Sequence, residues 1–335
     1  MCHLIYTDTF YMKRKWIRWV SWILLTPIIL FVILMVLLYI PPVQNLLRRE
    51  VTAYASKATG MQIQVERIDL RFPLNLLVRG VEVIQQPDTL LSLESLNVRV
   101  QAWPLIKGKV EVDEVTLSRV AVNSADLMEG MNIKGVLGRF FLQSHGVDLS
   151  NELAVINQVE LSDTHVQLLM NDTTTTPKDT TASAPINWKV ALHQLKLKNV
   201  SFSMQLPADS MRMAAHIGEA AIDDAQADLK NQYYDLKKFL LSGTSVSYDT
   251  GTAQPAEGFD ASHIAVRDIR IALDSLLYKG RDMNAVIREF TMNERSGLSV
   301  TSLTGRAYSN DSVICVPGLK LNTPHSEIDL SAHTY

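Results

Sequence analysis

The longest apolar run in the chain extends from Trp19 to Ile40, 22 residues without a charged side chain. A helix rises about 1.5 Å per residue, so this run is long enough to cross the ~30 Å hydrocarbon core of a bilayer. A cleaved signal peptide would have a shorter apolar region and would end at a small-residue site, whereas Pro41-Pro42 follows here. The pattern therefore predicts a permanent membrane anchor over residues 19–40.

Basic side chains flank this anchor unequally. Four basic residues within residues 13–18 precede it, whereas Arg48 and Arg49, which follow it, are partly offset by Glu50. Because an excess of Lys and Arg stays on the cytoplasmic side of a membrane, residues 1–18 are predicted to be cytoplasmic. Everything that follows the anchor is then expected on the opposite side.

Residues 43–60 carry the helical period. Apolar side chains recur near every third or fourth position until Gly60, a residue type that commonly ends a helix. We expect a short amphipathic helix that forms a stalk or a cap over the first strands, with a position on the bilayer surface as the less favoured alternative. The apolar positions are Val43, Leu46, Leu47, Val51, Tyr54, Ala55 and Ala58.

From Met61 onward the apolar period changes to two, which is typical of strands with one apolar and one wet face. Within residues 110–122 the step between apolar residues lengthens to three at Asp113-Glu114 and again at Ser118-Arg119. Since strand side chains alternate between faces, a turn or bulge must absorb each extra residue. The same spacing recurs at Val78 and Val81, at Leu197 and Val200, and at Val266 and Ile269.

The strand signal continues to the last residues, with two departures. Residues 132–144 place five apolar side chains on one helical face and predict a helical interruption. Residues 173–185, rich in Thr, have no apolar pattern and predict a flexible linker, either at a hairpin tip or between domains. They separate a first β-rich segment, 61–172, from a second, 186–335, which we expect to be truncated because its strand signal does not fade.

Composition excludes several classes of protein. With 47% apolar and 20% charged residues the chain is neither disordered nor fibrous. A net charge of −3 gives no electrostatic reason to expect nucleic acid. The two cysteines, Cys2 and Cys315, lie on opposite sides of the predicted anchor, which excludes a disulfide framework.

The sequence contains no motif for catalysis, metal or cofactor binding that we can recognise. No two of the eight histidines have the spacing of metal ligands, and His165 and His193 fall on the polar phase of strands. His325-Ser326-Glu327 combines three catalytic residue types, but consecutive residues cannot form a relay. We therefore expect no enzymatic activity, no cofactor and no metal.

Three segments carry a resemblance to a known family. Leu96–Val100, Trp103–Lys109 and Val110–Leu117 succeed one another as a strand, a Trp-Pro-Leu-Ile-Lys-Gly turn and a returning strand. After an N-terminal anchor and a short helix, this succession resembles the AsmA-like superfamily of Gram-negative envelope proteins, specifically the N-terminal part of TamB-like members of Bacteroidetes type. Glu294–Leu298, followed by Leu319–Ile328, resembles recurrent segments of the same proteins.

The resemblance implies a mainly β fold, in which the anchor and helix precede a long, curved antiparallel sheet that forms a hydrophobic groove. It further implies an inner-membrane protein with its bulk in the periplasm. Such a protein transports phospholipid between the inner and outer membranes, assists outer-membrane protein translocation and assembly, or does both, with an Omp85-type outer-membrane partner.

Two other interpretations stay open. One is a membrane-anchored β-rich scaffold whose apolar face is covered by another sheet and carries no lipid, and the other is an anchored envelope hydrolase. The candidate groove residues are Val110, Val112, Val115, Leu117, Val120, Val122, Leu195, Leu197, Val200 and Phe202.

Overall fold

A computed structural model describes residues 26, 36, 39–71, 74–85, 87–101, 103–104, 111–124, 130–148, 151–171, 187–251 and 253–330. The predicted cytoplasmic segment 1–18, the linker 173–185 and most of the predicted anchor 19–40 lie outside these residues. Within the described part, no helix is both long enough and apolar enough to span a bilayer.

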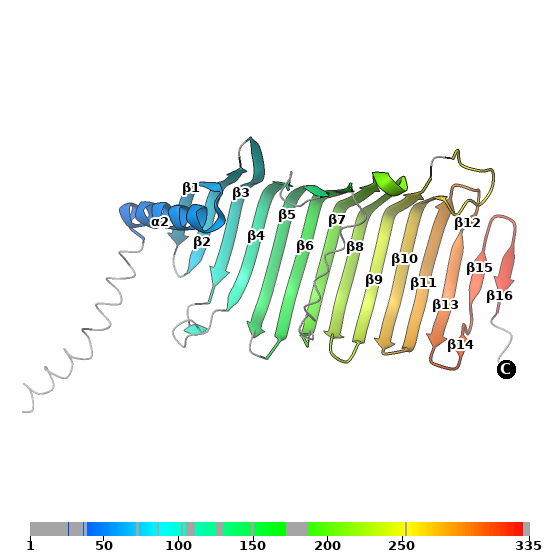
Figure 1. Ribbon diagram of the computed structural model, residues 1–335. Helices are drawn as coiled ribbons and strands as arrows, with labels where there is room; N and C mark the ends of the chain where they lie inside the picture. The colour runs from blue at the N-terminus through cyan, green and yellow to red at the C-terminus, as the bar shows by residue number, and fades with distance from the viewer. Residues whose placement is uncertain are drawn as a thin grey trace, which may run out of the picture.

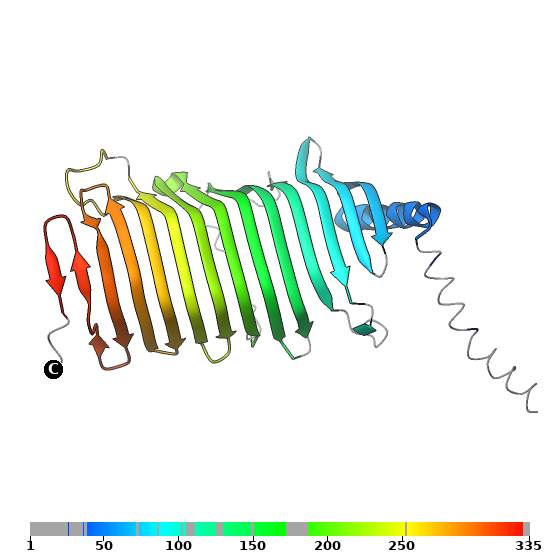
Figure 2. The ribbon, with the colours of Figure 1, turned by 180° about the vertical axis from the view of Figure 1, so that it is seen from behind.

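Sixteen strands form one curved, unclosed sheet (Figures 1 and 2). Strand order follows the sequence from β1 to β11 and continues through β13, β15 and β16, while β12 and β14 are short additions beside β11 and β13. The predicted mainly β fold is therefore confirmed. The bounds are β1 Gln62–Arg71, β2 Asn75–Gln85, β3 Asp88–Val100, β4 Val112–Asn123, β5 Met131–Asp148, β6 Leu153–Met170, β7 Lys189–Leu206, a 3-10 turn Pro207–Asp209, β8 Met211–Asp228, β9 Tyr233–Asp249, β10 His263–Lys279, β11 Asp282–Glu294, β12 Ser299–Val300, β13 Ser302–Ser309, β14 Ile314–Cys315, β15 Lys320–Asn322 and β16 Glu327–Asp329.

The described part of the sheet is one layer thick. Each strand makes its extensive contacts with its neighbours in the sheet, and helix α2 (Pro41–Thr59) makes them with β1. Only eight apolar residues of the described part are buried, four of them alanines, and they are scattered over the strands. A packed sandwich would need a second layer over the apolar face, and the described strands supply none.

One strand pair departs from the antiparallel arrangement. β6 and β7 run parallel, with Leu153 opposite Lys189 and Leu169 opposite Gln205, so the sheet is mixed. The prediction of a wholly antiparallel sheet is wrong at this pair, because β6 and β7 are not the two strands of a hairpin. A parallel pair needs a connection that returns along the strand. The 18 residues between Met170 and Lys189 match the 18 of β6, which is enough at about 3.3–3.6 Å per residue.

Residues 132–144 belong to strand β5 and are not the predicted helix. The misleading signal comes from an extra residue at Gly138, which lengthens the step between apolar positions to the three residues that also suit a helix. In the strand the five apolar residues divide between two faces: Ile133, Leu137 and Phe140 lie opposite Leu168, Thr164 and Leu161, whereas Val136 and Phe141 lie opposite His165 and Glu160.

A line of extra residues, here called the seam, crosses the sheet from β1 to β10. On every one of these strands two residues, not one, separate consecutive positions that share a face at this level, and these positions are apolar except for Thr164 on β6 and Thr244 on β9. From β1 to β9 the pairing keeps its register across the line. The seam confirms that an extra residue is absorbed at Ser118-Arg119, because Arg119 has a left-handed φ of 47°. The seam residues are Glu66, Gly80, Glu94, Arg119, Gly138, Asp163, Asn199, Gly218, Gly243 and Asp268.

Left-handed backbone recurs along the seam, with positive φ on β2, β4, β6, β7, β9 and β10. A non-glycine residue in this conformation costs about 1–2 kcal/mol, least for Asn and Asp. Asp163 and Asn199 face each other and share a hydrogen bond of 2.8 Å, while Arg119 forms an ion pair with Glu94 on the neighbouring strand. Cross-strand polar contacts thus accompany the strained positions.

Helix α2 protects the outer edge of β1. An uncovered edge strand offers unpaired N–H and C=O groups to other chains, and here polar side chains of the helix bind those groups. The predicted end of the helix at Gly60 is confirmed: its φ is 70° and its N–H donates to the Ser56 carbonyl at 3.0 Å. The edge contacts are Gln44 Nε2 to the Leu70 carbonyl at 3.1 Å, Arg48 Nη1 to the Val65 carbonyl at 3.1 Å, and the Ile63 N–H to Ser56 Oγ at 3.1 Å.

Candidate functional site

The apolar residues of successive strands align into unbroken rows across the sheet. Residues that pair across neighbouring strands point to the same face, so the pairing shows directly which side chains lie together. Two rows each contain eleven apolar residues, one from every strand between β1 and β11. The first row is Leu70, Leu76, Val98, Val115, Leu142, Val159, Leu195, Ile222, Phe239, Leu273 and Ile287; the second is Ile68, Val78, Leu96, Leu117, Phe140, Leu161, Leu197, Ala220, Leu241, Ile271 and Phe290.

Two further rows lie beyond the seam on the same face. The third joins seven apolar residues and one buried threonine: Val65, Val81, Leu93, Val120, Leu137, Thr164, Val200 and Ile217. The fourth joins Ile63, Val83, Leu91, Val122, Gly135, Val166, Phe202, Ala215, Val246 and Val266. We call the four rows together the apolar face.

The apolar face contains eight of the ten groove candidates predicted from the sequence, and a ninth lies beside it. Eight belong to its four rows, and Val112 lies opposite Val100, two residues along β3 from Val98 of the first row. Val110 lies outside the described residues. The sequence therefore grouped residues that the strand pairing also places together, because the two-residue period and its three-residue steps map onto strands and seam.

The apolar face is accessible to a ligand. Val115, Leu117, Leu195 and Leu197, near its middle, are half-buried, and Phe202 is 40% exposed. In a closed protein, side chains of this size in the centre of a sheet are buried by a second layer. Exposed apolar surface on this scale is typical of a binding surface.

The opposite face of the same strands, here called the wet face, carries rows of polar residues, although Val136 and Phe141 of β5 also lie on it. One of its rows contains nine consecutive polar residues, from β1 to β9. Arg99 and Glu114 of that row form an ion pair of 3.2 Å, and Gln194 donates to Asp223 at 3.4 Å. The row is Arg71, Asn75, Arg99, Glu114, Gln143, Gln158, Gln194, Asp223 and Lys238.

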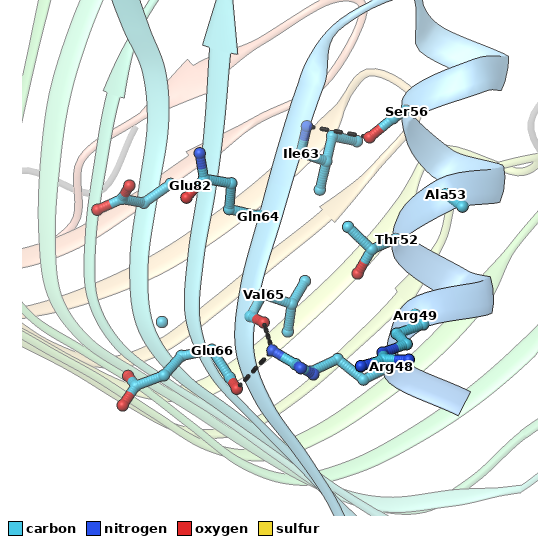
Figure 3. A pocket seen from close by; sticks show the side chains of 11 residues that line it. Arg48, Arg49, Thr52, Ala53, Ser56, Ile63, Gln64, Val65, Glu66 and Glu82 are labelled. Carbon is cyan, nitrogen blue, oxygen red and sulfur yellow. Dashed lines mark hydrogen bonds between the residues drawn. The ribbon is translucent and has the colours of Figure 1, made fainter. Parts of the chain in front are cut away.

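A cavity of about 690 Å³ lies where helix α2 meets the first two strands (Figure 3). On the helix side it is lined by Arg48, Arg49, Thr52 and Ser56. The carboxylates of Glu66 and Glu82, which also line it, extend away from α2 in Figure 3. The helix side therefore presents cationic and hydroxyl groups at the end of the sheet that is nearest the predicted anchor.

Catalytic chemistry finds little support among the described side chains. No group of three or more His, Cys, Asp or Glu residues in the described part could hold a metal ion. Ser201 and His216 lie 3.0 Å apart on the wet face, a pair that the sequence analysis missed because 15 residues separate them. Within the described part no carboxylate bonds to His216, so this pair lacks the third group that orients a base.

A polar hollow of about 240 Å³ on the wet face also lacks an arranged nucleophile. Ser144, which lines it, donates its hydroxyl to the Val112 carbonyl, and His145 lies 3.0 Å from the amide oxygen of Asn157. His193, which the sequence places on the polar phase of a strand, contacts Asp224 at 3.0 Å on an exposed part of β7. These contacts join neighbouring strands instead of presenting a reactive group.

Among the described titratable groups, Asp260 in the connection between β9 and β10 has a strongly lowered pKa. Backbone N–H groups of Ala256 and Ser262 and the ring of His263 bond to Asp260, which lowers the pKa of this carboxyl to about 2. Because hydrogen bonds to the charged form favour it, Asp260 holds the loop as a carboxylate. This arrangement is structural.

No protein-family model and no curated protein sequence matches this chain.

Proposed function

We propose that this chain is a membrane-anchored envelope protein whose apolar face carries the acyl chains of phospholipids between the inner and outer membranes. The observation that supports it is the continuity of the apolar rows: an apolar residue follows an apolar residue on eleven successive strands. Neither catalysis nor a small-molecule pocket requires such a surface. A cargo that is apolar along its whole length and moves along the sheet does require it.

The energetics explain why such a surface must not be interrupted. Two acyl chains of about 16 carbons would cost ~25 kcal/mol to expose to water, at ~0.8 kcal/mol per methylene. An apolar face of uniform character keeps each position at a similar free energy, so a bound chain can slide from one strand to the next. The wet face leaves the protein soluble between the membranes.

The length of the sheet suits a protein that covers part of the distance between the two membranes. Fourteen strands stand in line along the sheet, which at about 4.8 Å per strand gives roughly 60 Å. In the proposed orientation the N-terminus is cytoplasmic, the anchor lies in the inner membrane and β1 is the strand nearest to it. Lipid then moves from β1 toward β16, where an outer-membrane partner of the Omp85 type receives it.

Photo-cross-linking from the apolar face tests this function in the full chain. A photoreactive amino acid at Leu195, in the first apolar row, should capture phospholipid in cells, and mass spectrometry of the adduct would identify it. The matched control is Lys196, the next residue, which lies on the wet face and is exposed. Both positions are far along the sheet from the anchor, so lipid that surrounds the anchor does not contribute.

Three outcomes are distinguishable. Phospholipid adducts at Leu195 and not at Lys196 support lipid carriage. Protein adducts without lipid at Leu195 mean that another chain covers the face, as the scaffold interpretation requires. A turnover product instead of an intact lipid would point to the hydrolase.

A further inference from the structure

Helix α2 is oriented opposite to an ordinary surface helix. An amphipathic helix normally turns its apolar stripe toward the protein. In α2 the side chains that bind β1 are Gln44, Arg48 and Ser56, whereas Leu46 is 58% exposed and Tyr54 is 77% exposed. The polar stripe holds the sheet, and the apolar stripe has no partner among the described residues.

Three exposed apolar residues lie on one side of the helix, which also carries the exposed Glu50, four residues from both Leu46 and Tyr54. At about 100° per residue, Leu46, Tyr54 and Val51 fall within roughly 140° of the helix circumference. Val51 is 45% exposed, so all three side chains are open to the surroundings along the helix. Leaving such a stripe in water is unfavourable, and it marks a surface that something apolar covers.

The position of α2 in the chain indicates which surface that is. The helix begins at Pro41, directly after the 22 residues without charge that are long enough to cross a bilayer. Arg49 and Lys57 are exposed on the same helix and suit the phosphates of lipid headgroups. Tyrosine is also a residue type that favours the membrane interface.

We propose that α2 lies flat in the interface of the bilayer that holds the anchor, with Leu46, Val51 and Tyr54 inserted among the lipids. Because its polar stripe binds the edge of β1, the helix then fixes the first strand at the membrane surface. A lipid that leaves the bilayer beside α2 meets the cavity of Figure 3 and then the first residues of the apolar rows. Only this last step rests on the proposed function.

Depth-dependent quenching in the full chain tests the placement. In a Cys2→Ser, Cys315→Ser background, Leu46→Cys and Tyr54→Cys carry an environment-sensitive fluorophore in vesicles of phosphatidylethanolamine and phosphatidylglycerol. Lys198→Cys, exposed on the wet face of β7, is the matched aqueous control. We expect a blue shift of the emission and its loss to lipid-borne nitroxides at positions 46 and 54, and neither change at position 198.

The opposite result would overturn the placement. Emission at positions 46 and 54 that stays red-shifted and is quenched only by a water-soluble quencher means that the stripe is in water. A blue shift without lipid quenching, with dimers on cross-linking, means that a second copy covers it. Intact lipid quenching without lipid adducts at Leu195 would leave this placement standing and reject the proposed function instead.

Discussion

The two faces of the sheet are built by the same strands, yet they follow different rules. On the apolar face the residue type hardly changes from β1 to β11: the first two rows contain only aliphatic residues, alanine and phenylalanine. On the wet face acidic, basic and amide side chains alternate without a fixed order and form ion pairs of local extent, such as Arg99 with Glu114. A surface that only keeps the protein in solution tolerates many kinds of polar side chain, whereas a path for an apolar cargo does not tolerate polar ones.

The seam allows the two faces to stay separate on strands that bend. An extra residue bends a strand, and an extra residue that no bulge absorbs would exchange the faces of everything that follows it. Because each strand from β1 to β10 absorbs its extra residue at the same level, the apolar side chains return to their own face on all of them. The bend and the segregation of the faces therefore come from one feature.

The largest expected effect comes from placing a charge on the apolar face. Leu197→Asp and Val115→Lys should each lower lipid capture from Leu195 at least about tenfold, because contact between an unpaired charge and an acyl chain costs well over ~1.4 kcal/mol. Expression should change little, since both side chains are half-buried and the charge stays hydrated when no lipid is present. Outer-membrane integrity should fall together with lipid capture.

Neighbouring residues on the other face provide the controls. Thr116→Lys and Ser203→Asp place the same charges on the wet face. Thr116 is the next residue after Val115, and Ser203 is the next residue after Phe202 of the fourth row. Both substitutions should leave lipid capture unchanged. If the substitutions on both faces behaved alike, the contrast between the faces would have no functional meaning, and lipid carriage would be rejected.

The sequence predicted the faces better than the topology, for physical reasons. Alternation is a local property, so Val115, Leu117, Leu195 and Leu197 could be assigned to one face without knowledge of strand pairing. The extra residue at Ser118-Arg119 was visible as a three-residue step for the same reason. Side-chain periodicity, however, contains no information about strand direction, and the parallel pair of β6 and β7 could not be predicted from it.

The incorrect prediction at residues 132–144 has the same origin as the correct one at Ser118-Arg119. Gly138 lengthens an apolar step to three, and a single such step inside a strand is indistinguishable from helical spacing. Only the pairing of Gly138 with the seam residues on either side shows that it belongs to a strand. The contact of α2 with β1 agrees with the expected cap over the first strands. The sequence left open which side of the helix meets the sheet, because periodicity shows that a helix is amphipathic but not which side meets the protein.

A smaller effect is expected from filling the seam. A methyl group at Gly218 would meet the Gly243 carbonyl oxygen at 2.9 Å and the Ser242 carbonyl oxygen at 3.0 Å, both of them backbone atoms that cannot move freely. Gly218→Ala should therefore lower the free energy of unfolding by about 1–3 kcal/mol, measured by denaturant titration. Its control is Gly135→Ala on the apolar face, where the nearest atom is 3.4 Å away and the change should stay within about 1 kcal/mol. Equal effects at the two glycines would show that the strands do not approach closely at the seam.

The smallest expected effect is a local response to pH in the connection between β9 and β10, which contributes no residue to the four rows of the apolar face. Asp260 has a folded-state pKa of about 2, below its ordinary 3.8, because Ala256, Ser262 and His263 bond to the carboxylate. A lowered pKa means that the contribution of Asp260 to stability is present above pH 3.8 and is lost as the pH falls toward 2. The protection factors of the Ala256 and Ser262 amides, which correct exchange rates for their intrinsic dependence on pH, should therefore fall over that interval. Asp260→Asn should remove this fall while lipid capture at neutral pH stays unchanged. A loss of lipid capture in Asp260→Asn would mean that this connection contributes to the path of the cargo, and the contrast between the two faces would then be incomplete as an account of function.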